Sequence, residues 1–580
     1  MQANTSVPLF SVEKMMQANL PVVNNSILNT PVKTALQYLF HEQQCNQIAD
    51  KHAHLSGIDF IEQVLAEFDV SYAVPNQEIE NIPVTGRLVI YANHPIGSLD
   101  ALALIKLISQ VRTDIKVVAN ELLMAIPQLH SILIPVKNLT GGTPKQHIAT
   151  IHQWLNNEGV VIIFPSGEVS RLRPHGVTDL KWNSGFLRFA KSCHAPLLPI
   201  YIDAKNSASF YGASMLYKPL ASLLLVKEMF KQGGNTLPMR IGELIAKEVV
   251  ASNEPVLKSK VALLKNHLYR IGKDRSGLFP TQKAIAHPEP RQQLQTALSQ
   301  CTLLGETPDN KQIYLYQHQG SNPIMREIGR LREVAFRAVG EGTGKRRDID
   351  KYDNSYCHLV LWDPQALEIA GAYRFACVQQ IFNQDPQGLY SQTLFHYSPQ
   401  FQPYFEQGLE LGRSFVQPKY WGRRSLEYLW LGIGAYLRLH PQYRYLFGAV
   451  SLTPTIPKTA KDLIVYFYLH HFADRQQLAT STNPYVLCSN IKQTYDQLFS
   501  SANYADNFKT LKRTLSNMEV SVPTLFKQYS ELCDQDSGGV KFIDFGTDPE
   551  FGDCIDGLVL VDIHQLKATK QQKYITSQVN

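Results

Sequence analysis

Long apolar runs are missing from this chain: no stretch reaches the roughly 18 consecutive apolar residues that a membrane-spanning helix needs. The first twenty residues also lack the charged start and apolar core of a secretory leader. The eight cysteines contain no Cys-x-x-Cys pair, which disfavours a zinc site and a disulfide framework and indicates thiols in a reducing compartment. These absences predict a cytoplasmic protein whose contact with a membrane, if any, is peripheral.

Strong charge of either sign is also absent. The formal net charge is +6 over 580 residues, too small and too dispersed to indicate nucleic acid as a partner, although it suits anionic lipid or an acidic carrier protein. The length and the 44% hydrophobic content predict two domains. We place them at residues 1–285 and 286–580, because a polar, proline-rich stretch follows residue 285.

The first chemical pattern follows a buried strand. The apolar run 88–92 stops at Asn93 and His94, and apolar residues resume only after Asp100, so the pattern predicts a strand, a loop eased by Gly97, and a helix. His94 and Asp100 can therefore meet at one edge of a sheet. A carboxylate that holds an imidazole fixes its tautomer, and the free ring nitrogen can then take a proton from a hydroxyl attacking an acyl group. The alternative is that the two are unrelated polar residues of a loop.

Two further apolar runs support the catalytic interpretation. Residues 160–163 indicate a second buried strand, and residues 197–202 a third. Strands and helices alternate from 87 to 202, with one helix expected over 121–129, which indicates an α/β layered domain. A polar loop follows the second strand, and its candidate substrate-binding residues are Phe164, Pro165, Ser166, Gly167, Glu168 and Arg171.

In this order the three blocks resemble those of the glycerolipid and lysophospholipid acyltransferases: an Asn-His-then-Asp motif, a Phe-Pro-Glu-Gly-like motif and a later apolar block containing proline. The chain departs from that pattern twice, with five residues instead of four between His94 and Asp100, and with the second block's glutamate after its glycine. The resemblance implies that His94 is the general base, that Asp100 orients it, and that Asn93, Gly97 and the 164–171 loop bind substrate.

The segment 211–230 is crowded with apolar and aromatic residues and carries lysines at its edges. An apolar face edged by lysines can lie in a lipid headgroup layer. A helix packed on its own domain would show the same pattern. Because an acyltransferase of the kind that the sequence resembles acts on a lipid acceptor, we favour the membrane interpretation.

A second constellation of charged residues lies beyond residue 340. Glu410 and Arg413 stand in an otherwise apolar predicted strand, where a charge is costly unless it is paired. Their spacing places them on opposite faces unless a bulge intervenes. A Gly/Arg loop then precedes an apolar helix at 426–437, an arrangement that offers a phosphate site. The candidate substrate-binding residues of this half are Asp348, Asp350, Asp353, Arg374, Arg413, Gly422 and Arg423.

This half resembles the Gcn5-related acyltransferase fold and, within it, the acyl-homoserine-lactone synthases and more closely the ornithine-lipid N-acyltransferases, over 326–450 and again at 542–546. The resemblance implies that the spaced acids hold a cationic amino-acid acceptor. We expect Glu410 to take the proton from the amine, with the spaced acids as the alternative. The basic residues implied to meet an acyl carrier protein and its phosphopantetheine are Lys345, Arg346, Arg347, Arg423 and Arg424.

Together the two resemblances predict an α/β protein of two domains, one with helices around a mixed sheet and one with a Gcn5-related mixed sheet. They imply a bifunctional ornithine-lipid (aminolipid) acyltransferase on the inner face of the cytoplasmic membrane. Acyl carrier protein would donate both chains, with no bound cofactor or metal. One alternative is a lysophospholipid acyltransferase fused to an acetyl-CoA-dependent transferase. The other is a membrane-active, haemolysin-like protein, for which the His94 and Asp100 pattern has no use.

Overall fold

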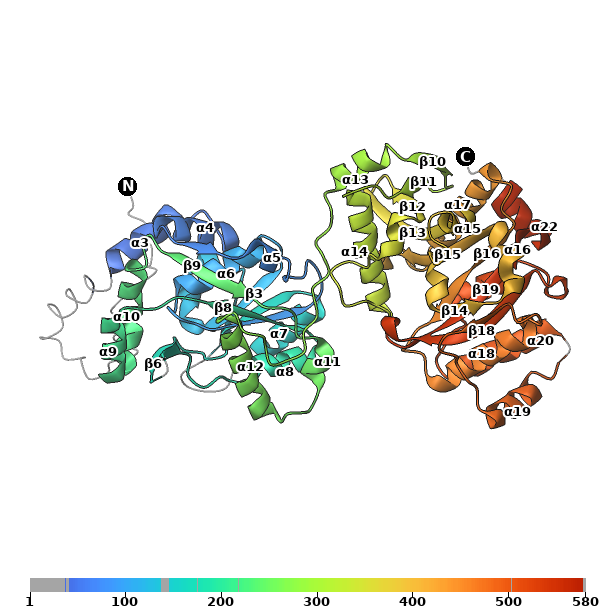
Figure 1. The fold of residues 1–580 in the computed structure, drawn as a ribbon. Helices are drawn as coiled ribbons and strands as arrows, with labels where there is room; N and C mark the ends of the chain where they lie inside the picture. The colour runs from blue at the N-terminus through green and yellow to red at the C-terminus, as the bar shows by residue number, and fades with distance from the viewer. Residues whose placement is uncertain are drawn as a thin grey trace, which may run out of the picture. The chain divides into compact units, whose positions relative to one another are not determined.

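A computed structural model describes residues 37, 41–136, 145–174, 176–216, 218–501 and 503–576 of the chain. The side chains of 122, 125 and 215–223 also lie outside this description. The chain divides into two compact units, Met1–Ala284 and Ile285–Asn580 (Figure 1). Among the described residues, no helix combines the length and apolarity that crossing a membrane would require.

The N-terminal unit is built on a seven-stranded sheet. All of its strand pairs are parallel except β8 with β9, so the sheet is mixed. In spatial order its strands are β1 (Ser71–Ala73), β9 (Thr236–Ile241), β8 (Leu197–Ile202), β2 (Leu88–Ala92), β5 (Val160–Ile163), β3 (Ile115–Asn120) and β4 (Leu133–Val136). A small hairpin, β6 (Arg171–Arg173) and β7 (Gly176–Thr178), stands apart from the sheet.

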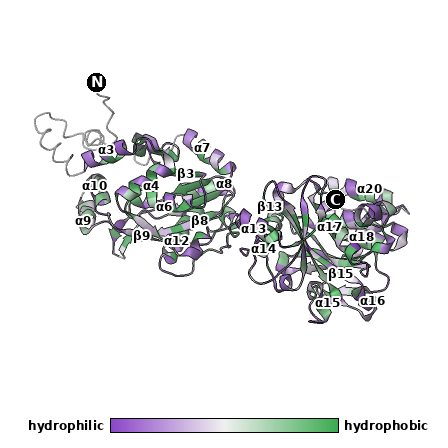
Figure 2. Cartoon of the chain, turned by 90° about the horizontal axis from the view of Figure 1, so that it is seen from above, coloured by the Kyte–Doolittle hydropathy of each residue, from purple (hydrophilic) through white to green (hydrophobic). Residues whose placement is uncertain are grey.

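Strand β2 is buried along its whole length, and its side chains alternate between two cores. Leu88, Ile90 and Ala92 face a core shared with helices α4 and α6, whereas Val89 and Tyr91 face one shared with α7, α8 and α12. Hydrophobic colour accordingly gathers around β3 and β8 in Figure 2. The helices of this unit are α3 (Glu42–Lys51), α4 (Gly57–Glu67), α5 (Asn76–Ile79), α6 (Leu99–Ser109), α7 (Lys145–Asn156), α8 (Gly185–Ser192), α9 (Ala208–Leu216), α10 (Lys218–Phe230), α11 (Lys247–Ala251) and α12 (Leu257–Ile271).

The helix expected over 121–129 is wrong. Two short 3₁₀ helices, Glu121–Ala125 and Pro127–Leu129, occupy that stretch instead. Pro127 has no N–H to donate and disfavours helical geometry in the residue before it, so one continuous helix cannot run through this position.

The C-terminal unit contains an eight-stranded sheet with one parallel pair, β15 with β16. That pair is short: its register runs from Gly408↔Tyr445 to Glu410↔Phe447 and ends there. In spatial order the strands are β10 (Thr302–Glu306), β11 (Gln312–Gln317), β12 (Cys357–Asp363), β13 (Glu368–Cys377), β15 (Gly408–Val416), β16 (Tyr445–Leu452), β19 (Cys554–Asp562) and β18 (Val540–Asp548). A separate two-stranded sheet pairs β14 (Phe395–Tyr397) with β17 (Ala479–Ser481).

Helices cover both faces of this sheet. The core on one face joins β12, β13 and β15 to α17 and α18, and the cores on the other face use α14, α15 and α16. The helices are α13 (Arg291–Leu298), α14 (Pro323–Ala338), α15 (Val378–Phe382), α16 (Gln402–Glu406), α17 (Ser425–Leu439), α18 (Lys458–Phe472), α19 (Ser489–Leu498), α20 (Tyr504–Ser516), α21 (Thr524–Ser530) and α22 (Ala568–Lys570). Both units are therefore α/β layers around mixed sheets, as expected.

Candidate active sites

His94 and Asp100 lie together at the carboxyl end of β2. His94 follows that strand directly, Asp100 belongs to the first turn of α6, and Nδ1 of the imidazole lies 3.0 Å from Oδ2 of the carboxylate. The extra residue between them is accommodated by the loop, in which Gly97 adopts φ +90°. A Cβ at Gly97 would lie 2.5 Å from Cγ2 of Val169, so both the backbone angle and the close approach require glycine.

Asp100 is held as an anion. Its carboxylate accepts hydrogen bonds from the backbone N–H groups of Ile96, Ser98 and Ala101, at 3.1, 2.9 and 3.0 Å. Burial would raise the pKa of this group, but His94 and the backbone N–H groups of Ile96 and Gly97 outweigh burial and lower the pKa. An ionised Asp100 accepts the Nδ1 proton of His94 and so leaves Nε2 as the proton acceptor.

A second carboxylate, Asp179, stands behind His94, and the sequence did not single it out. It is 2% exposed. It accepts hydrogen bonds from the His94 backbone N–H at 3.3 Å, from Oγ of Ser170 at 2.5 Å and from Nε1 of Trp182 at 2.9 Å. Burial would lower the pKa of His94, but the Asp100 charge, reinforced by Asp179, raises it.

The 164–171 loop follows β5 and closes over the histidine. The ring of Phe164 lies 4.4 Å from the His94 ring, centroid to centroid. Other polar groups of the loop form hydrogen bonds that hold its shape. Ser166 Oγ donates to the Glu168 carbonyl at 2.6 Å, and the Pro165 carbonyl accepts from the N–H of Asn183, outside the loop, at 2.8 Å. Gly167 makes the turn at φ +63°.

Arg171 and Asn93 differ in what they leave for a substrate. In Arg171, Nε and Nη1 are buried and have no hydrogen-bond partner among the described residues, while its guanidinium lies 5.6 Å from the Phe210 ring centroid. In Asn93 the side-chain amide donates to the Ile202 carbonyl and accepts from the Ile202 N–H, both at 2.8 Å. Asn93 therefore ties β2 to β8, and contact of either residue with substrate stays a prediction.

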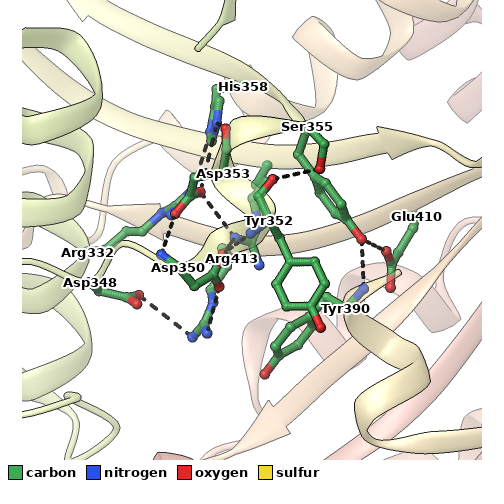
Figure 3. A network of polar contacts seen from close by, with 12 residues as sticks. Arg332, Asp348, Asp350, Tyr352, Asp353, Ser355, His358, Tyr390, Glu410 and Arg413 are labelled. Atoms are coloured by element: carbon green, nitrogen blue, oxygen red, sulfur yellow. Dashed lines mark hydrogen bonds and ion pairs between the residues drawn. The ribbon is translucent and has the colours of Figure 1, made fainter. Parts of the chain in front are cut away.

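In the C-terminal unit the spaced acids pair with arginines (Figure 3). Asp353 contacts Arg332 at 2.8 Å and Arg374 at 3.1 Å, and Asp350 contacts Arg374 at 2.6 Å. Burial would raise the pKa of Asp353, but the two guanidinium groups hold it well below the usual range. These acids are thus already neutralised, and their predicted contact with a substrate amine remains untested.

Both carboxylate oxygens of Glu410 accept hydrogen bonds from other residues of the protein. It is 2% exposed, its Oε1 accepts from the Ser391 N–H at 2.6 Å, and its Oε2 accepts from the Tyr356 hydroxyl. Burial raises the pKa of this carboxyl, although the two hydrogen bonds partly oppose that rise. Both oxygens are therefore engaged, and the expected catalytic part of Glu410 stays a prediction.

A bulge in β15 changes where Arg413 points. The pairing of β13 with β15 shifts between Ala372 and Arg374, and Arg413 adopts φ +50°. Its guanidinium lies 5.0 Å from the Tyr390 ring centroid, and the Tyr390 N–H donates to the same tyrosine hydroxyl that binds Glu410. Glu410 and Arg413 therefore lie on one side of the sheet, which is the outcome that a bulge permits.

The Gly/Arg loop precedes α17 as expected. Gly422 adopts φ +73° and Arg423 is exposed, with its guanidinium 5.7 Å from the Tyr420 ring centroid. The arrangement places exposed positive charge beside a helix N-terminus, where an anion is favoured.

Comparisons with known proteins match the two halves separately. The family described as Acyltransferase matches residues 25–274, and the Acetyltransferase (GNAT) domain matches residues 331–431. A glycine N(alpha)-acyltransferase of Bacteroides thetaiotaomicron is 34% identical over 310 residues, which are 50% of this chain and 89% of the relative. A lyso-glycine lipid O-acyltransferase of Phocaeicola vulgatus is 26% identical over 247 residues, 41% of this chain and 87% of the relative. An L-ornithine N(alpha)-acyltransferase of Brucella abortus is 32% identical over 164 residues, 25% of this chain and 55% of the relative.

The folds, the two sites and these matches define an acyltransferase with two acyl-transfer units. The chain belongs to the family of amino-acid N(alpha)-acyltransferases that includes the glycine relative, and an Acyltransferase-family unit precedes that part of the chain. The resemblances noted in both halves of the sequence are confirmed.

Proposed function

We propose that this chain makes an amino-acid-containing lipid in two steps. The C-terminal unit joins a 3-hydroxyacyl chain to the α-amine of the amino acid, and the N-terminal unit esterifies the hydroxyl of that chain. One observation carries the proposal: relatives named for N-acylation and for lyso-lipid O-acylation both match this chain, and the GNAT and Acyltransferase families match separate parts of it. The product of the first reaction is the acceptor of the second.

In the ester reaction, Nε2 of His94 takes the proton of the acceptor hydroxyl as its oxygen attacks the thioester carbonyl. A C–O bond forms, the C–S bond breaks, and the imidazolium returns its proton to the departing thiolate. The ionised Asp100, 3.0 Å from Nδ1, stabilises the imidazolium. Arg171 offers two buried, unpartnered nitrogens to an anionic group of the substrate.

The acyl donor is the thioester of an acyl carrier protein. Support comes from exposed basic residues, Lys345 and Arg423, of which Arg423 stands beside the N-terminus of α17. Turnover of purified protein with acyl carrier protein and with coenzyme A thioesters tests this choice. Faster turnover with coenzyme A thioesters would contradict it.

The chain works at the inner face of the cytoplasmic membrane without crossing it. Helices α9 and α10 hold the predicted membrane segment, and Leu224 and Leu225 within it pack against Val169 and Phe210. Tyr211 belongs to the same cluster, and Met229 and Phe230 pack against a core of the unit, so these side chains serve packing within the domain. Alkaline carbonate or high salt should release the protein from membranes, and release by detergent alone would contradict a peripheral attachment.

The amino acid is ornithine in our first proposal, because the C-terminal motifs resemble the ornithine-lipid enzymes. Glycine is the second candidate, since the glycine relative is matched over 89% of its length and the ornithine relative over 55%. Mass spectrometry of lipids from a host that lacks aminolipids but expresses this chain distinguishes the two head groups directly.

The same experiment tests the two-step scheme. Wild-type protein should yield amino-acid lipid with both amide and ester chains, and His94→Ala should accumulate the amide-only lyso-lipid. Undiminished diacylated lipid in His94→Ala would remove His94 from the mechanism. Acylation of host lysophospholipid alone, without amino-acid lipid, would favour the lysophospholipid acyltransferase alternative.

A further inference from the structure

Buried carboxyls that the sequence did not single out gather where β18 and β19 meet the end of β16. Asp548 and Asp556 are each 4% exposed and Cys554 is 1% exposed. One polar atom of each lies within 4.8 Å of those of the other two. Glu341 is half-buried, and burial together with the charge of Asp556 raises its pKa.

These carboxyls form no close ion pair among the described residues, although the charge of Arg413 acts on all three. No ion pair joins Asp548, Asp556 or Glu341 to a lysine, arginine or histidine in the described parts of the chain. Asp556 accepts a hydrogen bond from Ser451 Oγ at 2.6 Å. Acids that lack a close ion pair in a protein interior are costly, and a ligand that supplies positive charge would stabilise them.

Arg413 gives an independent indication of a ligand at the same place. Its side chain is 9% exposed, and its Nε is buried with no hydrogen-bond partner in the part of the chain that the structure describes. Its guanidinium carbon lies 4.0 Å from the ring centroid of Phe551, in the loop between β18 and β19. Its other nitrogens only loosely approach Asp348 and Asp350, at 3.7 and 3.4 Å. An arginine buried with an unused donor can bind a carboxylate.

The sheet places these groups on the two sides of an interrupted ladder. The pairing of β15 with β16 ends at Glu410↔Phe447, and Arg413 lies just beyond that point on β15. Ser451, at the end of β16, pairs on its other side with Asp556 of β19. Backbone N–H and C=O groups past the end of a ladder need other partners, which a bound substrate can supply.

We propose that this cluster is the acceptor site of N-acylation, in which Asp556 takes a proton from the amino group of the amino acid and Arg413 binds its carboxylate. The inference rests on the proposed function and names the acceptor site of its first step. The substrate ammonium gives one proton to Asp556, which passes it to solvent. The neutral amine then attacks the thioester carbonyl, an N–C bond forms, the C–S bond breaks, and the second amine proton leaves with the thiolate as thiol.

Asp556 is better suited than Glu410 to accept the proton of the amino group. Burial raises the pKa of Asp556 to about 6, and the nearby Asp548 adds to the rise, while the Ser451 hydrogen bond and Arg413 oppose it. Asp556 is therefore ionised at pH 7 and more basic than an ordinary carboxylate. Burial likewise raises the pKa of Glu341 to about 7. The titratable and charged groups that face Asp556 from the surrounding elements are Glu341, Tyr390, Arg413, Asp548 and Cys554.

Amide formation by the purified full-length chain tests the proposal. Thiol release from 3-hydroxyacyl carrier protein is measured with ornithine and with glycine between pH 5 and 9. In wild type, kcat should rise with pH through a limb near pH 6, because only the carboxylate accepts a proton. Asp556→Asn should lower kcat about a hundredfold and abolish that limb. The matched control is Asp553→Asn, at an exposed position with φ +59° in the loop between β18 and β19. It should leave kcat and the pH limb unchanged.

Two further variants keep the proposal testable if Asp556→Asn folds poorly, which thermal unfolding monitors. Glu341→Gln should move the limb to lower pH, because it removes a neighbouring negative charge. Arg413→Lys should raise KM for the amino acid more than it lowers kcat, since lysine cannot make the bidentate contact.

Several outcomes would overturn the inference. One is a folded Asp556→Asn protein with wild-type kcat; another is loss of the limb in Glu410→Gln rather than in Asp556→Asn. Amide formation that stops with EDTA and returns with a divalent cation would make the cluster a metal site. A wild-type chain that forms no amide with either amino acid would instead refute the proposed function, and calorimetric binding of the amino acid without donor separates the two failures.

Discussion

At the scale of single residues, Asp179 gives the sharpest test of the ester site. It accepts from the His94 backbone and raises the pKa of the imidazole. A raised pKa keeps His94 protonated, and inactive as a base, up to a higher pH. Asp179→Asn should therefore shift the rising limb of ester formation to lower pH, measured with lyso-lipid as acceptor. A shift to higher pH, or none in a folded variant, would contradict this placement of Asp179.

The buried Asp556 carboxyl should also cost stability. Its folded pKa of about 6 lies above the ordinary value of 3.8, so the fold favours the protonated form. Below pH 4 the carboxyl is protonated in the folded and the unfolded chain alike and costs no stability. As the pH rises through 6 the folded chain must ionise it, and the free energy of unfolding falls by the full cost. Asp556→Asn removes the charge and should stabilise the C-terminal unit by on the order of 2 kcal/mol at pH 8. Thermal unfolding should show this gain fading towards pH 4, and a destabilised variant at pH 8 would contradict it.

At the scale of elements, local signals predicted what local chemistry decides. The β2–loop–α6 unit follows from an apolar run, a glycine and a polar stretch within a few residues, and the structure forms it with His94 beside Asp100. Asp179 could not be predicted in this way, because it reaches His94 from 85 positions away. No local pattern in the sequence marks it.

The C-terminal site was harder to predict for the same reason. The acceptor cluster comes from five separate parts of the chain, and the register of β16, β19 and β18 brings three of them together. The bulge that turns Arg413 also leaves no clear mark in the sequence, since its αL residue is not a glycine. Periodicity identified the strands but could not reveal which acids the sheet would bring into contact.

The loop between β2 and α6 gives a prediction at this scale. Gly97→Ala places a Cβ 2.5 Å from Val169 and forces alanine into φ +90°, at a cost of about 1–3 kcal/mol. The His94 loop should shift, and ester formation should fall at least tenfold while amide formation persists. Gly185→Ala in α8, where the added Cβ would approach only Phe189, at 3.9 Å, is the matched control. Equal ester rates in the two variants would show that the loop tolerates the side chain.

At the scale of the whole molecule, two acyl-transfer sites in one chain imply reactions in series. Each site is built within its own compact unit: His94 and Asp100 lie in residues 1–284, and the acceptor cluster lies in residues 285–580. Among the described residues, the groups named for each site all come from one unit. Damage to one unit should therefore leave the chemistry of the other intact.

This separation predicts complementation between two inactive chains. A full-length His94→Ala protein should make amide-only lyso-lipid, and a full-length Asp556→Asn protein should make almost no amide but retain its ester site. When both are added to the same lipid vesicles with donor and amino acid, diacylated lipid should form, because the lyso-lipid released by one chain reaches the intact His94 of the other. Synthetic lyso-lipid should likewise restore ester formation by the Asp556→Asn protein alone. If synthetic lyso-lipid is esterified but the mixture yields none, the intermediate passes within one chain without release; if neither is esterified, the two units are not independent.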